Sequence, residues 1–392
     1  MITIEQQLEQ LFPDMVKRRR FLHQHPEVSY QEKETSAYVA KCLEELGIPV
    51  KRGERGYSVV GELKGAHPGP TVALRADMDA LPIQDAKSVD YASKVPGVMH
   101  ACGHDAHTTT LLAIAEVLSG RKDELKGTIR FLFQPAEEIS PGGAAPLIAE
   151  GAMEGVDAVY GVHLWAPLPT GEAQTKSGAF MAAADEFFID VKGKGGHGGL
   201  PHQTIDSVLV GSQIVVNLQS IVSRHMDPTE PCVVTVGSIH AGSSFNVIAE
   251  TCSLNGTVRT FSIEARDRIR EQMKTIAEQT GAMYGAQVDF RYKVGYPPVV
   301  NDEKETDRFF KVGVSVFGEK QVSKSPFIMA AEDFAYYLER VPGCFVFVGA
   351  GNKEAGIDAP HHHPRFDIDE SSMIYAARLL IGLALDYMNE HA

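Results

Sequence analysis

A thiol, several imidazoles and a pair of carboxylates occur in three short stretches of this 392-residue sequence. The first stretch reads Met-His-Ala-Cys-Gly-His-Asp-Ala-His over residues 99–107, the second reads Gln-Pro-Ala-Glu-Glu over 134–138, and the third is Gly-Val-His over 161–163. Soft sulfur, borderline nitrogen and hard oxygen donors together suit a borderline divalent metal such as zinc. The sequence therefore predicts hydrolytic chemistry at a metal site.

Each of these stretches also has a simpler interpretation. A lone cysteine such as Cys102 is most often a small buried hydrophobe, and adjacent glutamates such as Glu137 and Glu138 often begin a solvated helix. The histidines around Cys102, among them His104, favour the metal interpretation, because so many ligand-capable side chains rarely gather in a core. Neighbouring residues at a strand end point to opposite sides, so one glutamate can bind metal while the other takes a proton from water.

Two further groups extend the predicted site. Asp77 and Asp79 lie on one side of an extended chain, where they are either turn residues or carboxylates that orient a ligand imidazole, and we favour Asp79 for the second role. The run of three histidines at 361–363 is either a surface loop or the source of one more ligand. One such imidazole makes five candidate ligands, the other four being Cys102, His104, Glu138 and His163. Five ligands are more than the four of a closed zinc site, which indicates two metals with a shared ligand.

A glycine-rich loop over 192–202 carries His197. The loop is either a flexible hairpin or the means by which His197, from a lid or a partner subunit, stabilises a developing oxyanion. Asn246 and Arg259 are the other polar residues that we place near substrate, since the fork of an arginine suits a free carboxylate.

Strands that alternate with helices predict an α/β fold with a doubly wound, mostly parallel sheet. Several polar candidates directly follow predicted strands, and the carboxyl ends of such strands are where functional residues gather. The predicted strands are 71–74, 128–133, 158–162 and 344–348, and the predicted helices are 4–46 (interrupted at 25–27), 108–118 and 372–388.

Between residues 183 and 292 the pattern changes to βαββαβ, the order of a ferredoxin-like α+β domain. We predict strands at 186–191, 232–237, 252–259 and 287–290, and helices at 205–224 and 263–284. The first helix is apolar on more than one face, which indicates a subunit contact as well as a core. The predicted organisation is a catalytic domain formed by residues 1–182 together with residues 293–392, interrupted by an inserted lid and dimerisation domain over residues 183–292.

Composition limits the partners that we expect. A net charge of -14 argues against nucleic acid, and no apolar run approaches the ~20 residues that span a bilayer. The first residues lack the pattern of a secretory signal, and five scattered cysteines fit a reduced compartment. We therefore expect a cytoplasmic enzyme with no nucleic-acid or membrane partner.

Four motifs together resemble the amidohydrolase branch of the dimetal aminoacylase and carboxypeptidase superfamily, which includes N-acyl-L-amino acid amidohydrolases, hippurate hydrolases and auxin-conjugate hydrolases. They are HACGHDAH at 100–107, QPAEE at 134–138, GGHGGLPH at 195–202 and HHPRF at 362–366, so the resemblance covers essentially the whole chain. It implies Glu137 as general base, Asp79 as the orienting carboxylate and His197 in the oxyanion role. The metal ligands that it implies are Cys102, His104, Glu138, His163 and His362.

The sequence thus predicts a metal-dependent amidase that splits N-acyl-L-amino acids into a carboxylate and an amino acid. Two divalent ions are expected, zinc on the softness of cysteine, with manganese, cobalt or nickel as alternatives. We expect a homodimer or homotetramer that assembles through the inserted domain. A dipeptidase or carboxypeptidase of the same superfamily is the nearest alternative. A non-enzymatic metal-binding scaffold is the alternative of another class, and an intact Glu137 beside Glu138 argues against it.

Overall fold

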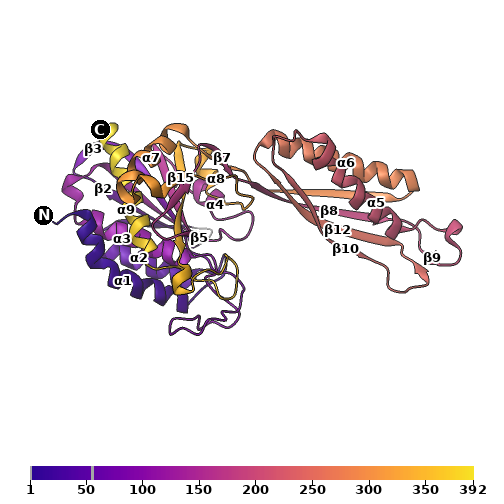
Figure 1. Cartoon of the computed structure of the whole chain (residues 1–392), viewed down its shortest axis with the longest axis horizontal. Helices are drawn as coiled ribbons and strands as arrows, with labels where there is room; N and C mark the ends of the chain where they lie inside the picture. The colour runs from indigo at the N-terminus through magenta and orange to yellow at the C-terminus, as the bar shows by residue number, and fades with distance from the viewer. Residues whose placement is uncertain (1, 54–56) are drawn as a thin grey trace. The chain divides into compact units, whose positions relative to one another are not determined.

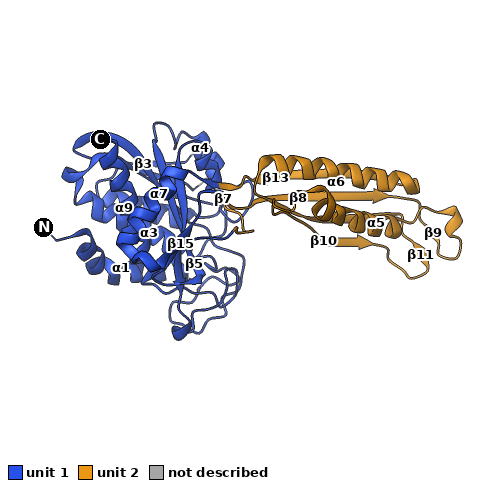
Figure 2. Cartoon of the chain, turned by 45° about the horizontal axis from the view of Figure 1, so that its top comes forward, with its two compact units in different colours: residues 1–178, 300–326, 333–392 blue, residues 179–299, 327–332 orange. Residues whose placement is uncertain are grey.

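The computed structural model describes residues 2–53 and 57–392, which form two compact units (Figures 1 and 2). Unit 1 consists of Met1–Gly178, Val300–Pro326 and Asp333–Ala392, and unit 2 of Ala179–Val299 and Phe327–Glu332. Unit 2 begins before and ends after the predicted insertion 183–292, and at the later end its last long strand continues to Tyr296. The lid and dimerisation roles of this segment stay predictions.

Unit 1 is built on a sheet in which eight strands are described. The four central strands, β4, β3, β5 and β16, are parallel to one another, and β1 and β2 pair antiparallel at one edge. The predicted α/β fold with a mostly parallel sheet is therefore confirmed. In spatial order the strands are β1 (Val50–Arg52), β2 (Val59–Lys64), β4 (Lys126–Gln134), β3 (His67–Asp77), β5 (Ala158–Pro169), β16 (Gly343–Gly351), β6 (Ala173–Thr175) and β15 (Val322–Lys324).

The central strands are buried along most of their length, as parallel strands covered on both faces must be. Every residue of β16 is buried, and so is β3 from Val72 to Asp77. Helices α1, α3 and α9 pack on one another, and α3 and α9 also contact the sheet. The helices of this unit are α1 (Ile4–Gln24), α2 (Lys33–Glu45), α3 (His104–Ser119), α4 (Ala144–Ala149), α7 (Glu303–Phe317), α8 (Ala335–Leu338) and α9 (Ser372–Glu390).

Unit 2 is an antiparallel sheet covered by two helices (Figure 2). Its chain order is β8 (Ala183–Lys192), α5 (Ser207–Ser220), β10 (Val233–Ala241), β12 (Thr251–Thr260), α6 (Ile263–Tyr284) and β13 (Gln287–Tyr296), the predicted βαββαβ order. The spatial order is β10-β12-β8-β13, and a short pair, β9 (Gly196–His197) with β11 (Val247–Ile248), lies beyond it. Phe187, Ile214 and Ile269 lie in its core.

Helix α5 is shorter than the predicted helix 205–224, because the chain passes into a wider π turn at Ile221–His225. Val208, Leu209 and Val216 of α5 are exposed, so the apolar surface of this helix is larger than its own unit covers. No helix in the described ranges is both long and apolar enough to cross a membrane.

Candidate metal centre

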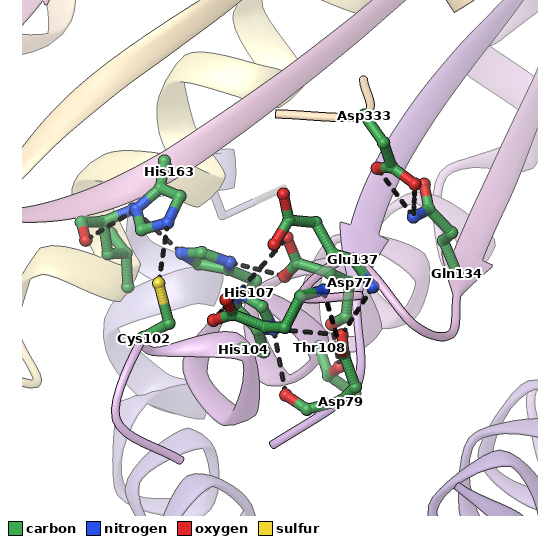
Figure 3. A network of polar contacts seen from close by, with 12 residues as sticks. Asp77, Asp79, Cys102, His104, His107, Thr108, Gln134, Glu137, His163 and Asp333 are labelled. Atoms are coloured by element: carbon green, nitrogen blue, oxygen red, sulfur yellow. Dashed lines mark hydrogen bonds and ion pairs between the residues drawn. The ribbon is translucent and has the colours of Figure 1, made fainter. Parts of the chain in front are cut away.

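Predicted site residues of unit 1 gather near the carboxyl ends of its parallel strands, and Figure 3 shows Asp77, Asp79, Cys102, His104, Glu137 and His163 among them. Asp77 ends β3, His163 lies within β5, and His104 begins α3. The residue before His104 is Gly103, whose φ of 92° is left-handed. Glycine takes this conformation without a Cβ penalty, so the chain can turn sharply between Cys102 and His104.

Asp79 connects three of the predicted site residues. Its Oδ1 accepts the backbone amide hydrogen of Glu137 and its Oδ2 that of Glu138, each over 3.0 Å. Its Oδ1 also lies 3.3 Å from Nδ1 of His104. Burial alone raises the pKa of Asp79, but hydrogen bonds from His104 and Ser29 outweigh it and lower the pKa. Asp79 is therefore a charged, buried anchor for the two glutamates and one imidazole.

His104 presents one free nitrogen toward the glutamate pair. Its Nδ1 donates to the backbone oxygen of Asp79 over 2.9 Å, so Nε2 is the nitrogen that can bind a metal once it has lost its proton. Within the described ranges, His104 Nε2 and Glu138 Oε1 are both buried without a hydrogen-bond partner, and they lie 3.9 Å apart. Because zinc binds such nitrogen and oxygen atoms at about 2 Å, a single ion fits between them.

Cys102 links this pair to the rest of the predicted ligands. Its ligand atom lies within 4.8 Å of those of His104 and Glu138, and its Sγ is 3.3 Å from Nε2 of His163. Nε2 of His362 is 3.3 Å from Oε1 of Glu138. The structure thus brings together all five residues that the resemblance implies as ligands, with Cys102 near both His163 and the pair of His104 and Glu138.

Two further histidines lie among these donors, but hydrogen bonds occupy both of their nitrogens. His107 donates from Nδ1 to Asp77 over 2.6 Å and accepts the amide hydrogen of Leu164 at Nε2. His361 accepts the amide hydrogen of Ala166 at Nε2 over 3.1 Å, which leaves the proton on Nδ1, 3.7 Å from the sulfur of Cys102. Neither ring offers a metal a lone pair, whereas His104, His163 and His362 do.

In the metal-free site the imidazoles of His163 and His361 are neutral and the thiol of Cys102 is uncharged, whereas Asp77 and Asp79 outweigh burial and raise the pKa of His104 to about 10. Burial and the neighbouring rings hold the pKa of His163 well below its usual value, and burial lowers the pKa of His361 to about 3. Burial and the carboxylates of Glu138 and Glu137 raise the pKa of Cys102. A divalent ion would reverse this last effect, because a bound thiol loses its proton.

Sequence reasoning missed several residues that position these donors. Arg75 donates to Asp77 over 2.6 Å and to Asp333 over 2.9 Å, and all three side chains are buried. Glu32 accepts the amide hydrogen of Ala136 over 2.7 Å. The charged Arg75 inside an apolar strand was a usable signal, since such a residue must have buried partners, but nothing in the sequence indicated which ones.

The three remaining candidates lie in unit 2. His197 accepts the amide hydrogen of Gly199 at Nδ1, which puts its proton on the exposed Nε2. Asn246 lies beside it, because its backbone oxygen accepts the amide hydrogen of Gly198. Arg259 is half-buried on β12, and none of the ion pairs among the described residues involves it. The roles of all three toward a substrate stay predictions.

The fold and the site together define this protein as an α/β protein with a candidate metal centre, formed by a thiol, imidazoles and carboxylates near its strand ends. Residues 73–386 match Peptidase family M20/M25/M40, and the chain belongs to that family. The resemblance drawn from the four sequence motifs is thereby confirmed.

The names of proteins similar to this chain state more than one activity. The chain is 46% identical over 311 residues to an N-acyl-L-amino acid amidohydrolase of Geobacillus stearothermophilus, covering 79% of this chain and 84% of that one. It is 40% identical over 379 residues to thermostable carboxypeptidase 2 of Saccharolobus solfataricus, covering 96% of each. A solved Bacillus subtilis structure, described as a dinuclear metal-binding peptidase of the M20 family, matches with a TM-score of 0.85 and 37% identity, covering 97% of this chain and 99% of that one.

Proposed function

We propose that this protein is a metal-dependent amidohydrolase that splits N-acyl-L-amino acids into a carboxylate and a free amino acid. The observation that carries the proposal is the anchoring of Glu137 and Glu138 by one buried carboxylate, Asp79. Both glutamates are fixed through their backbone amides, and the carboxylate of Glu138 lies among the proposed ligands, 3.3 Å from Nε2 of His362 and 3.9 Å from Nε2 of His104. Similarity to the Geobacillus amidohydrolase supports the substrate class.

Cys102, His104, Glu138, His163 and His362 would hold two divalent ions. The chemistry that such ions supply when bound is Lewis acidity, which polarises an amide carbonyl and acidifies a water molecule. Thiolate, imidazole and carboxylate donors favour zinc, with manganese, cobalt or nickel as alternatives.

Glu137 serves as the general base in this proposal. It takes a proton from the attacking water and returns it to the leaving nitrogen, since expulsion of an amine requires protonation. His197 would donate from Nε2 to the oxyanion that develops at the carbonyl oxygen when water adds to the carbonyl carbon, and the bond from Gly199 to Nδ1 supports this tautomer. Arg259 would bind the free carboxylate of the amino acid, and Asn246 would contact substrate beside His197.

The geometry of unit 2 supports a homodimer. Arg259 pairs with Ala184 at one end of β12, whereas Thr251 at the other end pairs with Lys192, which leads into His197. Strand residues rise about 3.3 Å each, so Arg259 and His197 of one chain lie roughly 25 Å apart. One small substrate cannot contact both. We infer that the His197 and Arg259 that share a substrate come from different subunits, and that the exposed apolar side chains of α5 contribute to their contact.

We place the enzyme in the cytoplasm. All five cysteines are free thiols, which suits a reducing compartment. The expected partners are the small-molecule substrate and further copies of this chain.

A carboxypeptidase is the second candidate, favoured by similarity to the Saccharolobus enzyme. A hydrolysis screen separates the two. The metal-loaded protein is given N-acetyl, N-benzoyl and indoleacetyl amino acids, each as the free acid and as the amide, together with dipeptides. We expect the N-acyl acids to react fastest. Preference for dipeptides would establish the carboxypeptidase or dipeptidase alternative, and hydrolysis that persists after the metal is removed with a chelator would reveal a contaminating enzyme.

Arg259 is tested in the same screen. Arg259→Ala should narrow the difference in kcat/KM between an N-acyl amino acid and its amide, because only the acid uses the guanidinium. Arg291→Ala is the matched control, since Arg291 is an exposed arginine on the same sheet that pairs with Asp190. An unchanged ratio in Arg259→Ala would exclude it as the carboxylate ligand.

A further inference from the structure

A four-residue turn between α1 and α2, Ser29–Glu32, contacts the segment that carries the two glutamates. The hydroxyl of Ser29 donates to Oδ2 of Asp79 over 2.6 Å. The hydroxyl of Tyr30 donates to the backbone oxygen of Gly142 over 3.2 Å. We call these residues the Ser29–Glu32 turn.

Glu32 makes the most unusual contact of this turn. It occupies the N-cap position of α2, but its side chain accepts no amide hydrogen of that helix. Its Oε1 accepts the amide hydrogen of Tyr30 over 3.1 Å. Glu27 accepts the amide hydrogens of Glu34 and Thr35 instead. The carboxylate of Glu32 is 0% exposed and reaches across the sequence to the amide of Ala136, 2.7 Å away.

Ala136 is a residue that needs such support. Its φ of 55° lies in the left-handed region, which costs free energy for any residue with a Cβ. It directly precedes Glu137, so its backbone conformation sets the direction in which both glutamates leave β4. A hydrogen bond that holds Ala136 in this conformation therefore fixes where the two carboxylates point.

We propose that the Ser29–Glu32 turn is a positioning element that holds the loop bearing Glu137 and Glu138 in its working conformation, with Glu32 as its main residue. The turn supports this loop before the glutamates through Ala136, beside them through Asp79, and after them through Gly142. The consequence for turnover rests on the proposed function, whereas the consequence for the loop does not.

Glu32→Ala and Glu32→Gln in the metal-loaded enzyme test the proposal. We expect Glu32→Ala to lower kcat about 10- to 100-fold, the scale of a small misplacement of reacting groups, with KM and metal content unchanged. Amide hydrogen exchange of the peptide that covers residues 136–140 should become about tenfold faster. Glu32→Gln keeps an oxygen that can accept the amide hydrogen of Ala136. It should therefore have the wild-type kcat and the wild-type exchange rate of this peptide. Glu34→Ala, an exposed neighbour on α2, is the matched control.

The proposal is overturned if exchange of this peptide in Glu32→Ala equals that in Glu34→Ala, or if Glu32→Gln is as impaired as Glu32→Ala. Ser29→Ala is the second variant, in case Glu32→Ala does not fold, and it should speed exchange of the same peptide. If the wild-type enzyme hydrolyses none of the N-acyl amino acids, the proposed function fails, and the exchange comparison still decides whether the turn holds the loop.

Discussion

Leu164 donates its amide hydrogen to Nε2 of His107 over 2.9 Å, and that single bond removes His107 from the potential metal ligands. The ring already donates from Nδ1 to Asp77, so it has no lone pair left. The same reasoning separates His361 from its neighbour His362. Hydrogen bonds from backbone amides therefore decide which imidazoles of this site have a nitrogen that can bind a metal.

The first prediction compares those two neighbours. His362→Ala should reduce the bound metal, because His362 has a nitrogen 3.3 Å from the Glu138 carboxylate and no competing amide. His361→Ala should keep its metal, because His361 accepts a hydrogen bond from Ala166. Metal analysis of both purified variants checks this. The reverse pattern would assign the ligand role to His361.

The second prediction compares the two glutamates. Glu137→Gln should retain metal and lose about 10²–10⁴-fold in kcat, the usual cost of removing a general base. Glu138→Gln should lose metal, since a neutral amide is a poorer donor. Metal content and kcat are measured on the same samples. A Glu137→Gln enzyme with near-native turnover, or one without metal, would contradict the assignment.

The third prediction concerns protons. In the metal-free protein, burial lowers the pKa of His104, but Asp77 and Asp79 outweigh it and raise the pKa to about 10. Cys102 is likewise protonated at neutral pH. His104 therefore stabilises the metal-free fold fully below pH 6.5, and this contribution is lost as the pH rises through about 10.

Metal affinity should change in the opposite direction, rising about tenfold per pH unit for each proton that binding displaces. Titration calorimetry in buffers of different ionisation enthalpy counts these protons. Cys102→Ser should bind metal more weakly and release about one proton fewer. An equal count in the two proteins would return Cys102 to the role of an inert buried cysteine.

The fourth prediction tests whether His197 acts between subunits. Glu137→Gln and His197→Ala are each expected to be nearly inactive, the second by about 10²–10³-fold in kcat. When the two are mixed and allowed to exchange subunits, a mixed dimer contains one site with Glu137 and the partner's intact His197. Activity should therefore reappear. If the mixture stays as inactive as its components, His197 acts within its own chain or not at all.

The fifth prediction concerns stability. The guanidinium of Arg19 is fully buried and donates to Asp105 and Asp367, each over 2.9 Å. Arg19→Met removes the buried positive charge that both carboxylates face and should cost about 3–5 kcal/mol in the free energy of unfolding. Lys17→Met, which breaks an exposed pair with Asp14 on the same helix, should cost less than about 1 kcal/mol. Urea unfolding of both variants measures the difference, and equal midpoints would contradict it.

Much of the fold could be predicted because its signals are local. The buried strands β4 and β16 are short apolar runs, and the order of elements in unit 2 follows from alternating patterns. Strand β2 escaped prediction although its buried and exposed residues alternate, because a glycine and charged residues interrupt the run. Helix α7 was missed for a similar reason, since charged residues fill its first turns.

The site was predictable where its residue types are unusual and unpredictable where it depends on distant partners. Cys102 and the adjacent glutamates are conspicuous in the sequence. Glu32, by contrast, resembles any acidic residue before a helix, and its contact with Ala136 exists only in the folded chain. The choice between His361 and His362 likewise depends on a backbone amide in β5.

The order of the sheet has a consequence for synthesis of the chain. Strand β16 lies between β5 and β6, but nearly all of unit 2 is translated after β5 and before β16. While a ribosome is making those residues, β5 has one edge with no neighbouring strand, and an open edge on an apolar strand invites pairing with other chains. The nascent protein is therefore open to such pairing until residue 351 has emerged, and slower elongation across unit 2 should lower its soluble yield.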